Sequence, residues 1–328
     1  LFIKNDGELI FEITPVDSTN DYDFLLYPYI DSTFCNDLKN EKISPLRGNL
    51  SKPSNKSDGK TGLSSKAIKY VTVKGTETMF SKSIKVRAGE KYMLVVDNAT
   101  PNGKGYGVSF NCLQKIAISG RITDASKRPV KTIITLLDRN NSEVVKIVSS
   151  DDGAYKIVAE VKEEIDYSML FYNDLYMPMS DIVNTSMIDT NQNSLTIDKT
   201  MTKLKAGETY NLVYFHQTSI LLNVQGAAIL GLAQVMKKNP KMRIQIQGHA
   251  AKHELTKNST QVSGGFKIDP AIAEERAENI YWKLLQRGIP KERMEKIAFS
   301  SDRPLIAHPT TEAEKNMNKR VSIKILSL

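Results

Sequence analysis

Hydrophobic residues in the last third of the chain recur with two different periods. A period of two, typical of a strand with one buried face, appears in two stretches, at residues 242–246 and 321–325. Between these two stretches the spacing changes to three and four, which predicts an amphipathic helix that buries Ala273, Ala277, Ile280 and Leu284. Gly288 closes that helix as a C-terminal cap. In order, the region predicts strand, helix, strand, helix, strand, helix and strand.

The first two thirds of the chain predict mostly strands. Before residue 113, stretches rich in aliphatic and aromatic residues are separated by Asp, Asn, Gly and Pro, at residues 8–13, 23–27, 82–86 and 91–96. Residues 40–69 are rich in Ser, Lys, Gly and Pro, so we expect a long surface loop there. The strand pattern restarts near residues 113 and 205, which predicts module boundaries at these points.

Length and composition are those of an ordinary globular protein. The chain has 328 residues, 40% of them hydrophobic and 25% charged, which predicts two or three domains. No stretch approaches the roughly 18 apolar residues that a membrane-spanning helix needs, so we expect none. The chain begins without Met and without a charged-then-apolar leader, so we expect a mature or trimmed piece.

Three short motifs in the last third fall on predicted loops and element ends. The strand at residues 242–246 runs into a Gly-His-Ala-Ala loop that contains His249. The predicted helix opens with a segment that carries Arg276, and an Asn-Met-Asn-Lys-Arg segment with Asn318 and Arg320 precedes the last strand. In this order the motifs resemble the OmpA-like peptidoglycan-binding domain, which implies that fold for the last third of the chain.

That resemblance implies a site for the diaminopimelate of peptidoglycan stem peptides. In the family, an Arg on the second helix grips a carboxylate, and its position matches Arg276; a guanidinium fork pairs with a carboxylate through two hydrogen bonds. The family's Asp, which takes the ammonium group, is Ala251 here, and a methyl group cannot replace it. Asp269, Glu254 and Glu275 are candidates to substitute. The ligand-binding residues expected on this basis are Arg276, Asn318, Arg320, His249 and Asp269.

Arg276 has two interpretations at this stage. In the first, it is a ligand-binding or structural residue of the pocket. In the second, it is an exposed arginine at a helix start, paired with a neighbouring glutamate.

The two earlier regions resemble modules of exported bacterial proteins. Residues 21–24, 88–92 and 95–98 resemble the jelly-roll modules of exported Bacteroidetes-type proteins, akin to pre-peptidase C-terminal domains. The second region resembles the carboxypeptidase regulatory-like domain, a small transthyretin-like β-sandwich. This resemblance rests on residues 118–124, 127–130 and 151–155, with a glycine turn at Gly153. Both resemblances imply modules that dock or space other molecules.

The predicted fold class is multidomain. Two all-β sandwich modules, at residues 1–113 and 114–204, precede an α+β OmpA-like domain at residues 205–328. The resemblance implies that the last domain has a mixed four-stranded sheet packed with helices.

The net charge of +8 lies mostly in the last domain. Residues 207–328 hold 18 Lys and Arg against 11 Asp and Glu, a net charge of +7. This favours an anionic partner such as peptidoglycan carboxylates or lipid head groups. Nucleic acid is not expected, because no basic run or aromatic stacking motif accompanies the charge. A solvated basic surface remains an open alternative.

No pattern for catalysis is present. The sequence has no Gly-x-Ser-x-Gly, phosphate-binding loop or dinucleotide fingerprint, so we expect no enzyme and no cofactor. His249 and His253 lack a third ligand for zinc, so no metal site is expected. Asp21, Asp23 and Asp97 could hold calcium, although Asp near turns mostly caps them. Cys35 and Cys112 could form a disulfide or stay free.

These inferences combine into one expected function and one alternative. We expect a non-enzymatic, periplasmic, outer-membrane-associated protein that contacts peptidoglycan and docks outer-membrane or periplasmic proteins through its β modules. The alternative is a periplasmic subunit of an outer-membrane assembly or secretion machinery that has lost glycan binding. Ala251 favours the alternative, whereas Arg276 and Arg320 favour peptidoglycan binding.

Overall fold

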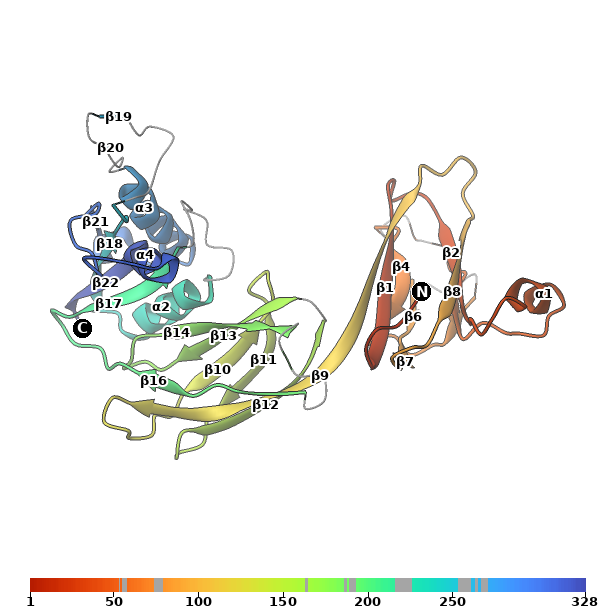
Figure 1. Cartoon of the computed structure of the whole chain (residues 1–328), viewed down its shortest axis with the longest axis horizontal. Coiled ribbons are helices and arrows are strands. Elements are labelled where there is room, and N and C mark those ends of the chain that lie inside the picture. Colours follow the sequence, from red (N-terminus) through yellow and green to blue (C-terminus); the bar gives the residue numbers. More distant parts are fainter. Residues whose placement is uncertain are drawn as a thin grey trace. The chain divides into compact units, whose positions relative to one another are not determined.

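The chain folds into two compact units in the computed structural model (Figure 1). The structure describes residues 1–52, 54, 58–73, 79–162, 165–185, 188, 193–215, 226–252, 261–262, 265–266 and 271–328. One unit comprises Leu1–Ile116, Val158–Ile165 and Thr185–Asn193, and the other comprises Ala117–Ile157, Asp166–Asn184 and Ser194–Leu328. The division into three modules at residues 113 and 204, and the jelly-roll and carboxypeptidase regulatory-like assignments, stay predictions.

The first unit holds two sheets around one hydrophobic core. Its elements are β1 (Gly7–Pro15), β2 (Tyr22–Pro28), α1 (Phe34–Lys39), β3 (Arg47–Asn49), β4 (Thr61–Ser64), β5 (Val71–Thr72), β6 (Phe80–Lys82), β7 (Ile84–Val86) and β8 (Tyr92–Asn98). One sheet has the order β5-β3-β2-β8, and in the other β1 lies between β4 and β9 (Tyr106–Asp124) and also pairs with β7. Alternate residues of β1 and β2 fill the core, where Phe11 meets Phe24 edge to face at 4.9 Å.

The expectation of a surface loop over residues 40–69 is wrong. The segment contains β3 and β4, and Asn49 and Thr61 are each only 1% exposed. Their polarity is compatible with burial because hydrogen bonds engage both side chains: Asn49 Oδ1 accepts from Ser51 N at 3.0 Å, and Thr61 Oγ1 donates to Met79 O at 2.7 Å. A low content of apolar residues therefore hid two strands.

The second unit begins with two β layers. One layer is a four-stranded sheet of β10 (Ile133–Leu137), β11 (Glu143–Val148), β13 (Asp166–Tyr172) and β14 (Met179–Asn184), in the order β11-β10-β13-β14. The end of β9 pairs with β15 (Ser194–Thr196) and β16 (Lys199–Met201), both parallel to it, and β12 (Ala154–Lys162) is also its neighbour. Both β9 and β12 contribute residues to each of the two compact units.

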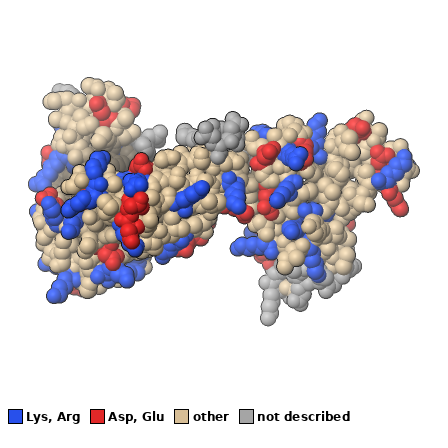
Figure 2. Space-filling model, turned by 90° about the horizontal axis from the view of Figure 1, so that it is seen from below, with Lys and Arg blue, Asp and Glu red and all other residues tan. Residues whose placement is uncertain are grey.

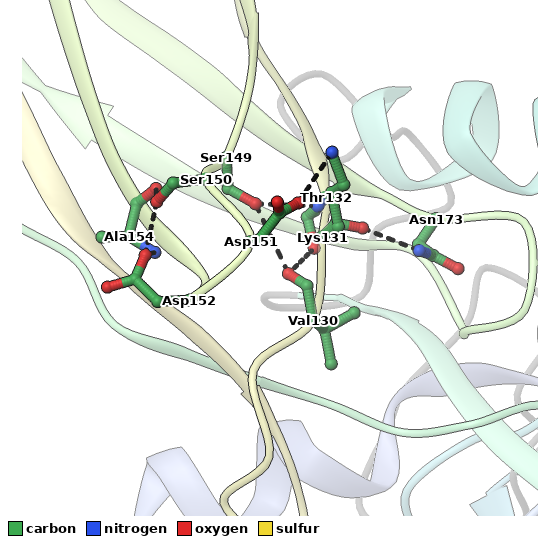
Figure 3. A network of polar contacts seen from close by, with 9 residues as sticks. All are labelled: Val130, Lys131, Thr132, Ser149, Ser150, Asp151, Asp152, Ala154 and Asn173. Atoms are coloured by element: carbon green, nitrogen blue, oxygen red, sulfur yellow. Dashed lines mark hydrogen bonds and ion pairs between the residues drawn. The ribbon is translucent and has the colours of Figure 1, made fainter.

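A polar network orders the turn that leads into β12 (Figure 3). Asp152 accepts hydrogen bonds from Ser150 Oγ at 2.5 Å and from Ala154 N at 3.2 Å, while Lys131 Nζ pairs with Asp151 at 2.8 Å. Gly153 has a φ of +79°, and a side chain there would collide with the carbonyl of Ile122. The turn predicted at Gly153 is therefore present.

The last third forms the predicted mixed four-stranded sheet. Its elements in chain order are β17 (Thr209–Tyr214), α2 (Gly226–Lys238), β18 (Arg243–Gly248), β19 (Gln261–Val262), β20 (Gly265–Phe266), α3 (Ala271–Gln286), a 3₁₀ helix (Lys291–Arg293), β21 (Met294–Ala298), α4 (Glu312–Asn318) and β22 (Arg320–Ser327). The main sheet has the order β17-β22-β18-β21, with β18 parallel to β21 and the other pairs antiparallel. The helix positions predicted to be buried, Ala273, Ala277, Ile280 and Leu284, are at most 1% exposed.

Helix α2 joins this sheet to the β layers before it. In Figure 1, α2 lies against β13 and β14. One hydrophobic core runs through the contact and includes Leu170 of β13 together with Leu232 of α2. At its closest point the helix has Gly231, where a Cβ atom would stand 2.7 Å from Leu170 Cδ1 and 2.7 Å from Pro178 Cβ. Asn239 Nδ2 also donates to Asp174 O at 2.9 Å.

We expect Gly231→Val to destabilise the second unit by about 1–3 kcal/mol, because the added side chain overpacks a contact that has no free volume. The measurement is the urea concentration at the midpoint of unfolding of the full chain. Lys237→Val is the matched control, since it places the same side chain at an exposed position of the same helix. Equal midpoints for the two variants would contradict the close contact.

Candidate functional site

The predicted site residues converge at one edge of the mixed sheet. Strands β17, β18 and β21 end at this edge and β22 begins there, as their registers require. Phe215, His249 and Phe299 each follow directly after one of the three ending strands, and Arg320 opens β22. Backbone hydrogen bonds close the edge: His249 N donates to Arg320 O at 2.9 Å, and Phe299 N donates to Gly248 O at 2.9 Å.

Gly248 lets the first turn of α3 approach the end of β18. A Cβ atom at this position would stand 1.8 Å from Ala273 O, so any side chain would push the helix away. Gly248 is the glycine of the Gly-His-Ala-Ala loop, and this steric requirement explains the residue type. The close approach brings Arg276 of α3 beneath the loop.

Arg276 is fully buried, so its interpretation as an exposed arginine at a helix start is wrong. Its Nη1 donates to His249 O at 2.9 Å, and its guanidinium carbon lies 4.7 Å from the centre of the Phe215 ring. These contacts join α3 to the ends of β18 and β17. The structure thus places Arg276 inside the predicted site, holding the loop that contains His249.

Asn318 is also buried and uses its amide to hold the loop before α4. Its Oδ1 accepts from Leu305 N at 2.7 Å and from Ile306 N at 3.0 Å, and its Nδ2 donates to Ile306 O at 2.8 Å. Three hydrogen bonds to one backbone segment fix the path of that loop. Asn318 therefore shapes the site, and direct contact with a ligand stays a prediction.

Arg320 is 5% exposed and lies across from His249 on the neighbouring strand. Its Nε donates to Asn211 Oδ1 at 3.2 Å and its Nη2 donates to Arg303 O at 3.0 Å. Its Nη1 is buried and has no hydrogen-bond partner in the part of the chain that the structure describes. Burial lowers the pKa of Arg320 to about 10, so the side chain remains charged at neutral pH.

His249 is 2% exposed, and among the described residues neither ring nitrogen has a hydrogen-bond partner. Its ring stacks on Phe299 with 5.6 Å between centroids and 29° between planes. Burial, followed by the positive charges of Arg320 and Arg303, lowers the pKa of His249 to about 3. The imidazole is therefore neutral at neutral pH and offers one donor and one acceptor.

Ala251 is 2% exposed, and the neighbouring Ala250 packs with Ile272 and Ala273. The described wall of the site near Ala251 is therefore apolar where the family resemblance leads one to expect a carboxylate. Asp269 and Glu254, two candidates to replace that carboxylate, lie outside the described residues. Glu275 is described and is exposed.

Sequence reasoning missed Phe299, Arg303 and Asn211 as members of this site. Arg303 lies with its guanidinium carbon 3.7 Å from the centre of the Phe299 ring, and Asn211 binds Arg320 and Ser322. For Phe299, the signal in the sequence was its position directly after a strand of the parallel pair, since such positions lie at the sheet edge.

Metal binding finds no support in the described part of the chain. No group of three or more His, Cys, Asp or Glu side chains in those ranges is arranged to hold an ion. Asp23 lies opposite Asp97 in the β2–β8 pair. His253 is outside the described residues, and Cys35 and Cys112 do not form a disulfide with each other.

A family model matches the last third of the chain. Residues 214–318 match the model of the OmpA family. This part of the chain is therefore an OmpA-like domain, as predicted. None of the helices in the described ranges has both the length and the apolar character required to cross a bilayer.

Individual relatives each match a part of the chain. The probable lipoprotein YiaD of Escherichia coli (strain K12) is 27% identical over 119 residues, which are 36% of this chain and 49% of YiaD. The chain thus spans about half the length of that curated relative. The peptidoglycan-associated lipoprotein of Burkholderia pseudomallei is 22% identical, with a TM-score of 0.29, over 36% of this chain and 88% of that structure. The periplasmic domain of Helicobacter pylori MotB is 20% identical, with a TM-score of 0.30, over 48% and 80%.

We expect the His249 ring to stay neutral in the folded protein as the pH falls from 6.5 toward about 3. The unfolded chain binds this proton near 6.5, so His249 contributes stability above that pH and this contribution is lost as the pH falls through the window. The measurement is the pH dependence of the His249 Cε1–H resonance, assigned by its absence in His249→Gln. A midpoint near 6.5 in the native protein would show that the ring is not buried.

Proposed function

We propose that this chain is a non-enzymatic cell-envelope protein that contacts peptidoglycan through its OmpA-like domain. The observation that carries the proposal is the pair of buried arginines, Arg276 and Arg320, at the sheet edge of a domain that matches the OmpA family. Buried guanidinium groups are rare, and they favour an oxyanion such as a stem-peptide carboxylate.

The proposed ligand residues are Arg276, Arg320, His249, Asn318 and Asp269. Of these, the first four converge at the sheet edge, as the contacts above show, and Asp269 lies outside the described residues. The proposed location is the periplasm, in association with the outer membrane. The β modules would dock outer-membrane or periplasmic proteins.

The charge of the molecule supports an anionic partner of a weak, salt-sensitive kind. On the face shown in Figure 2, basic and acidic side chains are intermixed and the basic ones cover more area. The intermixing does not resemble a continuous basic stripe for nucleic acid. An excess of positive charge attracts a polyanion over a distance that salt shortens to about 10 Å at 0.1 M.

We expect purified diaminopimelate-type sacculi to retain the full chain at low salt and to release it as the salt concentration rises. The measurement is the bound fraction after sedimentation of the sacculi. The variant that tests the site is Arg276→Lys, which keeps the charge but loses the guanidinium fork that binds a carboxylate through two hydrogen bonds. Retention of this variant at the wild-type level would remove Arg276 from the ligand site, and its thermal unfolding midpoint shows whether the fold is intact.

The second candidate function is an assembly subunit whose OmpA-like domain binds protein only. Ala251 favours it, because a buried methyl group cannot neutralise the ammonium group of diaminopimelate. Loss of all sacculus binding, with retention of a partner protein, would replace the first proposal by this one.

Ala251→Asp is expected to strengthen sacculus binding by roughly tenfold to a hundredfold, because a charged hydrogen bond contributes about 1.5–3 kcal/mol. Its effect should depend on Arg276, since both groups act on one ligand; the double variant with Arg276→Lys measures this coupling. Should neither wild type nor Ala251→Asp sediment with sacculi at low salt, peptidoglycan binding is the wrong function.

A further inference from the structure

The guanidinium group that the structure presents beside the buried site belongs to Arg303. Arg276 is fully buried and one of its donors is occupied by a backbone carbonyl, whereas Arg303 is exposed in the loop between β21 and α4. Its guanidinium carbon lies 3.7 Å from the centre of the Phe299 ring, and the same ring stacks on His249. The stack holds Arg303 above the sheet edge without using its hydrogen-bond donors.

A second guanidinium, that of Arg320, donates to the backbone of Arg303 and has no anionic partner among the described residues. Its two acceptors there, Asn211 Oδ1 and Arg303 O, are neutral oxygens, and its Nη1 is buried with no hydrogen-bond partner in the described ranges. A charge that is 95% buried is costly unless an opposite charge compensates it. Burial lowers the pKa of His249, and the positive charges of Arg320 and Arg303 lower it further.

We infer that Arg303, supported by the buried charge of Arg320 and by the unpartnered His249 ring, forms a carboxylate-binding subsite at the sheet edge. Two guanidinium groups and a neutral imidazole donor match a planar oxyanion, and guanidinium forks bind carboxylates through paired hydrogen bonds. The inference rests on the proposed function, because it takes a stem-peptide carboxylate as the ligand. Arg303 makes the contact, and Arg320 acts on the ligand through its charge.

This subsite does not need an acid at position 251. The groups that carry it lie at the ends of β18 and β21 and at the start of β22. It therefore explains how a domain with Ala251 can still bind an anion, and it predicts that recognition depends on the carboxylate more than on the ammonium group.

The test titrates the full chain with the tripeptide L-Ala-γ-D-Glu-meso-diaminopimelate and, in separate experiments, with glutarate and with inorganic phosphate. Arg303→Gln is compared with Arg243→Gln, which makes the same chemical change at an exposed arginine on the opposite end of β18. We expect Arg303→Gln to weaken tripeptide binding by roughly tenfold, the effect of losing a charged hydrogen bond. Arg243→Gln should bind as wild type does.

Three outcomes would overturn the subsite. Equal tripeptide affinity of Arg303→Gln and wild type removes Arg303 while leaving peptidoglycan binding intact. An equal loss in Arg243→Gln shows only the effect of net charge. Tighter binding of inorganic phosphate than of glutarate makes the carboxylate class wrong.

A spectroscopic readout separates this inference from the proposed function. The Nε–H resonances of Arg303 and Arg320, assigned with Arg303→Gln and Arg320→Lys, should shift on addition of glutarate. If they shift while neither tripeptide nor sacculi bind, the subsite stands and the peptidoglycan proposal fails. If they do not shift, the subsite is wrong whatever the sacculi do.

Discussion

The buried guanidinium of Arg276 is the contact on which the candidate site depends. It binds the carbonyl of His249 at 2.9 Å and lies over Phe215, so a single side chain connects α3 with the ends of two strands. The contact requires the tight approach of α3 to β18, which in turn requires Gly248. Removing the guanidinium would leave a buried carbonyl without this donor, and such losses typically cost about 1–3 kcal/mol.

Around this contact, polar side chains define the shape of the sheet edge. The amide oxygen and nitrogen of Asn318 both form hydrogen bonds with the loop before α4. Arg320 connects β22 to β17 and to the carbonyl of Arg303. At the same edge, the His249 ring and Arg320 Nη1 have no hydrogen-bond partner among the described residues. Buried polar groups are usually satisfied, so these two groups support the proposal of a ligand-binding site at this edge.

The OmpA-like domain is also bound to the β layers that precede it. Its helix α2 contributes to a hydrophobic core that continues into β13, with Gly231 at the closest approach. A shared core of this kind couples the stability of the two parts, so the boundary predicted near residue 204 separates two sequence patterns that pack together. The comparisons define the family of the C-terminal part only, because the match covers residues 214–318.

Local periodicity was enough to predict three elements of the last third. Strands β18 and β22 and helix α3 follow from alternation and from three-four spacing, because each pattern reports burial on one face of a regular element. The tertiary structure alone decided that Arg276 is buried, that residues 40–69 contain β3 and β4, and that Arg303, Phe299 and His249 stack. These features depend on contacts between residues far apart in the chain, and hydrophobic period carries no information about such contacts.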